Sequence, residues 1–260
     1  SMTYETILVE KENGTATVTL NRPPMNPLNS RMFKDLYSAF DDLSADQDVR
    51  TVIITGAGSK AFAAGADVTE MANLSPVEVY EVNMVSRKTF DKVENLGKPV
   101  IAAIAGIAFG GGCELALCCD FRIAAENLKI AFPETGLGII PGGGATVRLP
   151  KLIGVSKAKE MIYTGATVGA AAAEKLGLVD KVVPVETLAD EANALAAKIA
   201  AKPAVALKMA KESIQTGANV DVNSALNFEN QSFVTAFASE DAQEGLRAFL
   251  EKRKPNYKNK

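Results

Sequence analysis

Two glutamates lie in parts of the sequence that hold almost no other charge. Glu114 belongs to the segment FGGGCELALCCD (109–120), and it is the only charged residue between Pro99 and Cys119. Glu134 follows twenty residues later, in the segment KIAFPETGLGIIPGGG. An ionised carboxylate in apolar surroundings is costly unless it is paired or the chemistry of a site requires it. Two such carboxylates could share acid and base catalysis, with pKa values set by their surroundings.

The absence of histidine narrows the chemistry further. The chain of 260 residues contains none, which excludes Ser-His-Asp triads, H-E-x-x-H zinc sites and haem bound by a proximal histidine. Acid–base chemistry must then use carboxylates, lysine, tyrosine or cysteine. Cys113, Cys118 and Cys119 lie in one apolar run. Their odd number and their spacing predict buried free thiols in a reducing compartment, with no metal site.

Glycines directly precede Glu114. The triplet Gly110–Gly112 is expected to end just before a short helix (113–119), where backbone N–H groups are free to donate and the helix dipole adds positive charge. Such an arrangement can form an oxyanion hole, and the Gly/Ala-rich loop AFAAGAD (61–67) could supply a second N–H. Burial would raise the pKa of Glu114 and the helix N-terminus would lower it. The sequence leaves open which effect dominates.

Other interpretations of these segments also remain open. Glu114 could pair with Arg122 or Arg148, and Glu134 could cap a turn. The segment GAGSKA resembles a dinucleotide-binding turn only weakly, because no well-formed helix pattern follows it. The terminal KRKPNYKNK (252–260) predicts a solvated basic tail, or else a cationic patch for a polyanionic ligand.

Strands and helices alternate along the first two thirds of the chain. We expect a hairpin around Asn13-Gly14, helices from Ser30 to about Ala45 and from Ser75-Pro76 to near Gly97, buried strands at 49–55 and 99–106, and shorter strands at 120–126, 129–132 and 177–183, the last being the only clear strand after Gly154. Continuous apolar strands between helices imply parallel pairing and an α/β core. From about Leu188 to Phe249 the pattern is helical and favours a packing or oligomerisation role.

Composition bounds the class of protein. The net charge is −3, with 47% hydrophobic and 23% charged residues, which is typical of a globular protein and disfavours nucleic-acid binding. The opening segment SMTYETILVEKENG lacks an apolar targeting region. The run from 99 to 119 approaches membrane-spanning length, but its glycines and Glu114 favour a buried core. We therefore expect a cytoplasmic protein.

These motifs together closely resemble the enoyl-CoA hydratase (crotonase) family, from about Thr6 to Lys258. The matching segments are AFAAGAD, KPVIAAIAGIAFGGGCELALCCDFRIA, PETGLGIIPGGG, GLVDKVV and AFLEKRKPNYK, in the order in which the family carries them. The elements Gly-Gly-Gly-Cys-Glu-Leu-Ala and Pro-Glu-x-x-Leu-Gly are specific when they occur together. The chain departs from many members at Ala131-Phe132, which indicates a different wall of the acyl pocket. It also has Thr69 where other members have a lysine, and weaker CoA binding is expected from this loss of a positive charge.

The resemblance implies an α/β crotonase (ClpP-like) spiral of repeated β-β-α turns in two roughly perpendicular sheets. Residues 1–198 would form the core with the CoA and catalytic site, and residues 199–260 a C-terminal helical region for oligomerisation that also covers the CoA. Family members commonly form trimers, often paired into hexamers, so a homotrimer or homohexamer is expected. No metal and no cofactor are implied, because coenzyme A is part of the substrate, and neither nucleic acid nor membrane is expected as a partner.

The resemblance also assigns roles to residues, position by position. The implied reaction is the reversible addition of water to a 2-enoyl-CoA thioester to give a 3-hydroxyacyl-CoA, in fatty-acid β-oxidation or short-chain acyl metabolism. The N–H groups of Ala66 and Gly111 would hold the thioester oxygen. Glu114 would hold and deprotonate water, and Glu134 would protonate Cα. The further contacts with the acyl-CoA substrate would come from Ala64, Asp67, Phe249 and Lys252, the last two in some members from a neighbouring subunit.

Three alternatives to this reaction remain. Within the family they are an enoyl-CoA isomerase and a 3-methylglutaconyl-CoA hydratase. From another class, the chain could be a non-catalytic CoA- or RNA-binding protein. The two intact carboxylates argue against a non-catalytic role, and the acidic composition argues against RNA.

Overall fold

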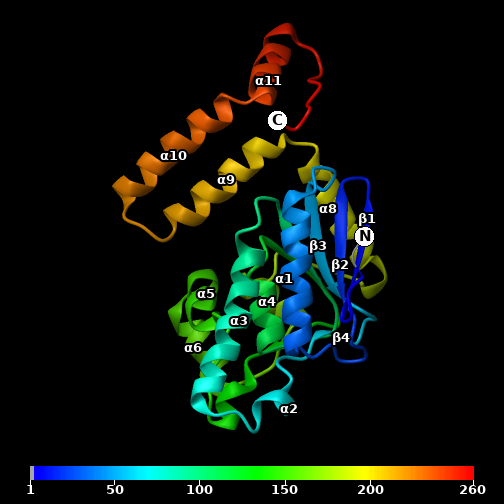
Figure 1. Cartoon of the computed structure of the whole chain (residues 1–260), viewed down its shortest axis with the longest axis vertical. Coiled ribbons are helices and arrows are strands. Elements are labelled where there is room, and N and C mark those ends of the chain that lie inside the picture. Colours follow the sequence, from blue (N-terminus) through cyan, green and yellow to red (C-terminus); the bar gives the residue numbers. More distant parts are fainter. Residues whose placement is uncertain (1–2) are drawn as a thin grey trace.

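Two β-sheets form the centre of the molecule in the computed structural model, which describes residues 3–260 (Figure 1). The larger sheet has six strands in the order β1-β2-β3-β5-β7-β10, and the smaller has four in the order β4-β6-β8-β9. The strands are β1 (Ile7–Glu12), β2 (Thr15–Leu20), β3 (Thr51–Gly56), β4 (Ala61–Ala63), β5 (Val100–Ile104), β6 (Ile107–Phe109), β7 (Phe121–Ala125), β8 (Lys129–Ala131), β9 (Val168–Gly169) and β10 (Lys181–Val183).

Parallel pairing dominates both sheets, as the apolar strands predicted. In the larger sheet only the β1–β2 hairpin is antiparallel. In the smaller sheet β4, β6 and β8 run parallel, and β9 pairs antiparallel with β8. Every residue of β5 is buried, because helices cover both faces of a parallel sheet and leave its strands no polar side.

Helices cover the larger sheet on both faces (Figure 1). α1 and α3 pack on each other over one face, while α8 packs against β3, β5 and β7. The helices are α1 (Ser30–Ala45), α2 (Val68–Met71), α3 (Pro76–Glu94), α4 (Gly111–Leu117), α5 (Ala145–Ile153), α6 (Val155–Thr164), α7 (Ala170–Leu176), α8 (Leu188–Ala200), α9 (Ala204–Gly217), α10 (Val222–Phe237) and α11 (Glu240–Glu251), with 3-10 turns η1 (Pro133–Leu137) and η2 (Val185–Thr187). Over residues 3–260 none of them has the length and apolar character needed to cross a membrane.

Helix starts follow local capping chemistry. The side chain of Ser75 accepts the N–H of Glu78, and the Glu78 carboxylate accepts the N–H of Ser75, which is a capping box at the predicted start of α3. The predicted cap of α1 is one residue late. Asn29 caps this helix by accepting the N–H of Met32, so Ser30 is already its first residue.

The predicted strand 99–106 corresponds to β5, and the strand β6 that follows it was not predicted. β5 ends at Ile104 and β6 begins at Ile107, because the chain turns at Gly106, whose φ is +73°. A Cβ at Gly106 would lie 2.1 Å from the carbonyl oxygen of Lys60, so this turn accepts only glycine. The strands β4 and β9 also differ from the prediction, which placed a loop at β4 and named no strand at β9.

The C-terminal helices project from the core. α9 and α10 pack on each other, and α11 lies at the end of the molecule opposite α2 (Figure 1). The predicted boundary between residues 198 and 199 falls inside α8, which packs on the larger sheet, so the projecting part begins after Ala200. The basic side chains of the predicted solvated tail are exposed, but its backbone is anchored: Asp241 accepts the N–H groups of Lys258 and Asn259 at 2.8 and 2.7 Å, which holds the terminal segment against α11.

Candidate active site

The segments that carry the predicted chemistry follow three neighbouring parallel strands. β4 pairs with β6 through Ala63 and Ala108, and β6 pairs with β8 through Phe109 and Ala131. The loop with Ala66 follows β4, the α4 turn with Glu114 follows β6, and Glu134 follows β8. Since the carboxyl ends of neighbouring parallel strands meet at one edge of a sheet, these segments converge there, which is where ligands bind in open α/β sheets.

Gly110 starts α4 and ties it to the neighbouring strand. Its N–H donates to the carbonyl of Ala131 at 2.9 Å, and its φ of +51° turns the chain sharply out of β6. The helix begins at Gly111, so the expectation that it follows the whole glycine triplet is wrong by two residues. Gly112 lies in the first turn, where a Cβ would meet the carbonyl oxygen of Ala63 at 2.1 Å. Its missing side chain lets α4 pack directly on β4.

Two backbone N–H groups lie close together at this edge. A Cβ on Gly111 would stand 3.6 Å from the nitrogen of Ala66, which shows how near the two backbones approach. The backbone of Leu28 pairs with the residues on either side of Ala66. Its carbonyl accepts the N–H of Asp67, and its N–H donates to the carbonyl of Gly65. Within residues 3–260 neither the N–H of Ala66 nor that of Gly111 donates to a protein acceptor, as expected for an exposed loop and a helix first turn. An oxyanion hole requires two free backbone donors that lie close together in this way.

Glu114 is buried, with 3% of its surface exposed. Its Oε2 accepts the N–H of Gly143 at 2.6 Å and the N–H of Ala145 at 3.0 Å. The alternative of a structural ion pair is wrong, since Arg122 donates instead to backbone carbonyls and Arg148 to the carboxylates of α3. Burial raises the pKa of Glu114 to about 7, and the N–H of Ala145 and nearby charges modify it less. Of the two opposing influences on this pKa that the sequence left open, burial and the helix N-terminus, burial therefore dominates.

Glu134 lies in the first turn of η1, directly after Pro133. Its Oε1 is buried and has no hydrogen-bond partner among residues 3–260, so this side chain does not cap a turn. Burial raises its pKa. A Cβ at Gly110 would come within 2.8 Å of its Oε2, so the glycine makes room for this carboxylate. A buried carboxylate oxygen without a partner is costly in a purely structural role, which makes Glu134 a candidate for a functional role.

Both carboxylates have raised pKa values. Burial is the largest cause for each of them, and the charge of Glu134 further raises the pKa of Glu114. One carboxylate can then act as a base while the other acts as an acid.

Ala64 and Asp67 flank the Ala66 N–H. The N–H of Ala64 donates to Met25 at 2.9 Å. The carboxylate of Asp67 caps α2 by accepting the N–H of Thr69 at 3.2 Å, and it also accepts the Thr69 hydroxyl at 2.6 Å. It forms an ion pair with Arg22 at 3.3 Å, and these contacts lower its pKa. The predicted substrate contacts at 64 and 67 therefore belong to the loop that carries the Ala66 N–H.

Phe249 and Lys252 lie away from this site. Both belong to the end of α11, and Phe249 is 82% exposed. Figure 1 places α11 far from α2 and α4, so within one chain these residues do not join the two glutamates.

The cysteines form no part of the chemistry. Cys113, Cys118 and Cys119 are buried and free, as the sequence predicted. Burial raises the pKa of the Cys119 thiol to about 12, which keeps it protonated. Residues 3–260 also contain no group of three or more side chains able to hold a metal ion.

Gly143 and Ala145 were not identified as site residues from the sequence. Their N–H groups hold Glu114 from 29 and 31 residues away. The available signal was the triplet Gly142–Gly144 before an apolar helix, which repeats the arrangement at Gly110–Gly112. A separate signal concerned the three strands that meet at this site: an Ala-Phe pair occurs in or directly after each of β4, β6 and β8.

Comparisons with known proteins show which family the chain belongs to. The family model described as "Enoyl-CoA hydratase/isomerase" matches residues 10–260. The chain is 45% identical over 260 residues to a crotonyl-CoA hydratase of Syntrophomonas wolfei, and 42% identical over 261 residues to a short-chain-enoyl-CoA hydratase of Clostridium acetobutylicum, with all of each chain covered. Among solved structures, an enoyl-CoA hydratase of Bacillus anthracis superimposes with a TM-score of 0.94 at 44% identity, covering 98% of this chain and all of the other.

Proposed function

The chain belongs to the enoyl-CoA hydratase/isomerase family, and on that basis we propose that it is an enzyme that reversibly adds water to the double bond of a short-chain 2-enoyl-CoA thioester. The product is the 3-hydroxyacyl-CoA. The observation that carries this proposal is the meeting of Glu114 and Glu134 with the free N–H groups of Ala66 and Gly111 at the ends of β4, β6 and β8. The short acyl chain rests on the names of the two relatives.

The oxyanion hole would stabilise charge on the thioester. When water attacks Cβ, negative charge develops on the thioester oxygen, and the N–H groups of Ala66 and Gly111 are free to donate to it. Removing one such donor typically costs about 10²–10³ in rate. Because the donors are backbone groups held by the Leu28 bridge and by the start of α4, they need little reorganisation during the reaction.

The two glutamates would divide the proton transfers. Ionised Glu114 takes a proton from water as the water oxygen bonds to Cβ, and protonated Glu134 delivers a proton to Cα. A proton then passes back from Glu114 to Glu134 to restore the starting state. The N–H groups of Gly143 and Ala145 orient the Glu114 carboxylate. Isomerisation needs only one carboxylate, so two available carboxylates favour hydration.

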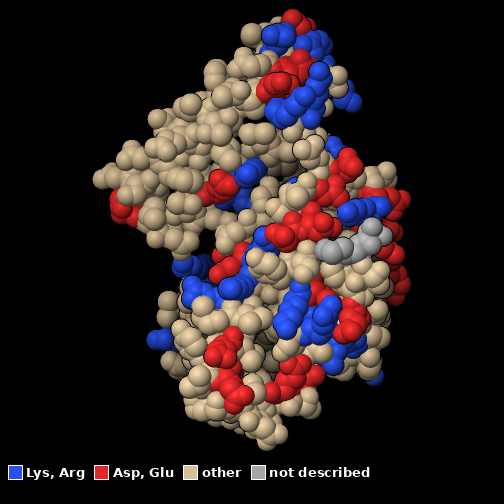
Figure 2. Space-filling model, in the orientation of Figure 1, with Lys and Arg blue, Asp and Glu red and all other residues tan. Residues whose placement is uncertain are grey.

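The coenzyme A moiety would lie beside the 64–67 loop, where Ala64 and Asp67 are placed to contact it. Phe249 and Lys252 are too distant within one chain, and we assign them to the CoA site of a neighbouring copy. The projecting helices also support a homotrimer or a dimer of trimers. Figure 2 shows few charged side chains over α9 and α10, and the exposed apolar residues there and on α11 are Ile214, Val222, Leu226, Phe233, Val234, Phe249 and Leu250.

This oligomer can be tested by light scattering. A mass near 27.4 kDa at micromolar concentration would contradict it. We further infer that the reaction requires no metal or cofactor besides the CoA of the substrate. A cytoplasmic location and a role in β-oxidation or short-chain acyl metabolism complete the proposal, the location being supported by three free buried thiols.

The decisive experiment follows the near-ultraviolet absorbance of the conjugated thioester of crotonyl-CoA after the protein is added, without metal or cofactor. Loss of absorbance, with its return from 3-hydroxybutyryl-CoA, is expected. No change with crotonyl-CoA or with longer and branched enoyl-CoA thioesters would contradict the proposed reaction.

A further inference from the structure

We propose that Arg148 is a positioning residue for Glu114, acting through the backbone turn 143–145. This inference rests on the proposed function only for its effect on hydration. Its geometric basis is a set of three successive peptide groups. The first and third contribute the N–H groups of Gly143 and Ala145, which both donate to Oε2 of Glu114. The middle one contributes the carbonyl of Gly143, which accepts from Nη1 of Arg148 at 3.2 Å.

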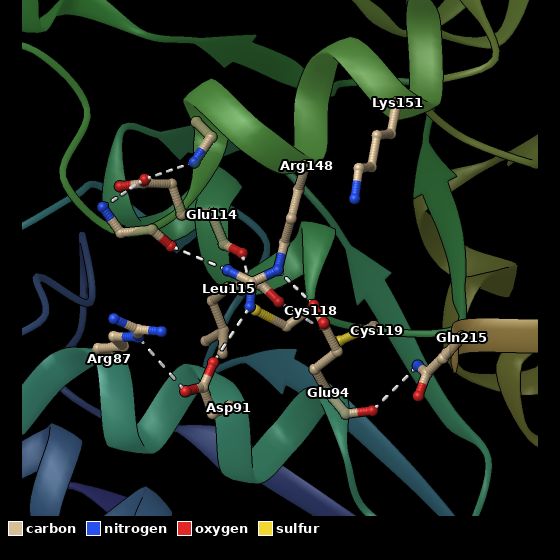
Figure 3. A network of polar contacts seen from close by, with 12 residues as sticks. Arg87, Asp91, Glu94, Glu114, Leu115, Cys118, Cys119, Arg148, Lys151 and Gln215 are labelled. Carbon is tan, nitrogen blue, oxygen red and sulfur yellow. Dashed lines mark hydrogen bonds and ion pairs between the residues drawn. The ribbon is translucent and has the colours of Figure 1, made fainter. Parts of the chain in front are cut away.

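The guanidinium is itself held firmly. Arg148 donates to Glu94 through Nε and to Asp91 through Nη2 at 3.4 Å, both on α3 (Figure 3). Only 19% of its side chain is exposed. α9 supports the same network, since Gln215 donates to the backbone carbonyl of Glu94 at 3.1 Å. The turn that orients Glu114 is thus fixed to α3 by one side chain, and a planar donor fork suits this double task.

The turn is shaped to admit Arg148. Gly144 has a φ of +108°, and a Cβ there would lie 2.1 Å from Nη1 of Arg148. The guanidinium therefore packs directly on the backbone of the turn, and a larger residue at position 144 would displace it. The glycine at position 144, its positive φ and the hydrogen bond from Arg148 to Gly143 are all consistent with a guanidinium packed on this turn.

Arg148 lies behind the site and not in it. It lines a cavity of about 770 Å³ between α3, α4, α5 and α9, which Phe90, Cys118 and Gly143 also line. Neither Glu134 nor Ala66 borders this cavity. A substitution of Arg148 therefore leaves the reacting face in place and changes only what supports Glu114 from behind.

Removing Arg148 should change the pKa of Glu114 in a predictable direction. The charges that act on Glu114 are Glu134, which raises its pKa, and Arg148, which lowers it, while Asp91 and Glu94 contact Arg148. Losing the guanidinium removes a positive charge and loosens two N–H donors to the carboxylate. Both changes disfavour the ionised form, so the pKa of Glu114 should rise.

The test compares Arg148→Met with the wild type in the free protein. Infrared difference spectroscopy follows the protonated carboxyl band that disappears in Glu114→Gln. We expect its titration midpoint to rise by roughly 0.5–1 pH unit. In crotonyl-CoA hydration the acidic limb of the pH profile should shift equally, and kcat at high pH should fall about tenfold, below the hundredfold cost of a full 1 Å misplacement. KM should stay within about twofold, because Arg148 lies behind the reacting groups.

Two further variants make the test specific. Arg87→Met is the matched control, because Arg87 also pairs with Asp91, at 3.6 Å, whereas the hydrogen bond to the Gly143 carbonyl comes from Arg148; its midpoint should not move. Arg148→Lys keeps the charge beside Glu94 but lacks the planar fork, and it should show a smaller rise if Arg148→Met does not fold. An unchanged or lowered midpoint in the folded Arg148 variant, or an equal rise in Arg87→Met, would overturn the inference. The infrared midpoint needs no substrate, so a wild type that fails to hydrate crotonyl-CoA would refute the proposed reaction alone.

Discussion

Gly143→Ala should damage the site through a single added methyl group. A Cβ at position 143 would lie 2.6 Å from Cε2 of Phe90 and 2.8 Å from Oε1 of Glu114. The backbone there is not in the left-handed region, so an alanine brings no conformational strain of its own. The perturbation is therefore purely one of space beside the carboxylate.

The magnitude follows from which neighbour can move. To reach ordinary contacts of 3.4 Å on both sides, the Glu114 oxygen must retreat by about 0.6 Å and the Phe90 ring by about 0.8 Å. Phe90 is 2% exposed and packs edge-on against Phe33 at 5.5 Å, so it resists this movement, and the displacement falls on the carboxylate and on the 143–145 turn that holds it. A 1 Å misplacement can cost about 10² in rate, and weakening a charged hydrogen bond about 1.5–3 kcal/mol, so we expect kcat to fall roughly 30- to 300-fold.

The assay is crotonyl-CoA hydration, with thermal unfolding measured beside it. Overpacking should cost about 1–3 kcal/mol, which lowers Tm by roughly 2–10 °C. Gly142→Ala is the matched control, because its Cβ would meet only Asn83, at 3.5 Å, which is an ordinary contact; its kcat should stay within about twofold. The reasoning is refuted if Gly143→Ala keeps wild-type turnover, or if both variants lose activity alike.

Three other predictions concern the chemistry of the site. Glu114→Gln and Glu134→Gln should each lower kcat at least about a hundredfold with an unchanged circular dichroism spectrum, since glutamine cannot exchange the proton; turnover near that of the wild type in either variant would contradict the division of roles. Hydration requires ionised Glu114, whose pKa is about 7, so kcat/KM should fall about tenfold between pH 8 and pH 6 as the carboxylate is protonated; a flat profile over that range would argue against Glu114 as the base. The three buried cysteines should react with a chromogenic disulfide reagent only after unfolding, and rapid reaction in the native protein would show that the α4 core opens.

Much of the fold could be predicted because its signals are local. The pair Ser75-Pro76 is a signal of only two residues, and it placed the start of α3 correctly. The continuous apolar runs of β3 and β5 are also local signals, and they predicted buried parallel strands. The strands β4, β6 and β8 have three residues each; β8 was predicted, but β4 and β6 were not, because so few residues show no clear alternation pattern. Their pairing depends on neighbours more than 20 residues away, which no local pattern contains.

The sequence by itself determined which groups could do chemistry. Without histidine, and with Glu114 and Glu134 alone among apolar and glycine residues, acid–base work by a carboxylate pair was the natural expectation. The glycines at 110–112 likewise indicated exposed backbone donors beside Glu114. Residue type decides these matters, because acidity, donor capacity and the lack of a side chain belong to each residue wherever it lies.

Only the tertiary structure decided how these groups meet and in which protonation state they act. The register of β4, β6 and β8 brings Ala66, Gly111 and Glu134 to one edge, and the turn 143–145 supplies the donors to Glu114. Whether burial or the helix N-terminus controls the pKa of Glu114 depends on how much water remains around it. Desolvation is the sum of contributions from all the surrounding segments, and it exists only once the chain has folded.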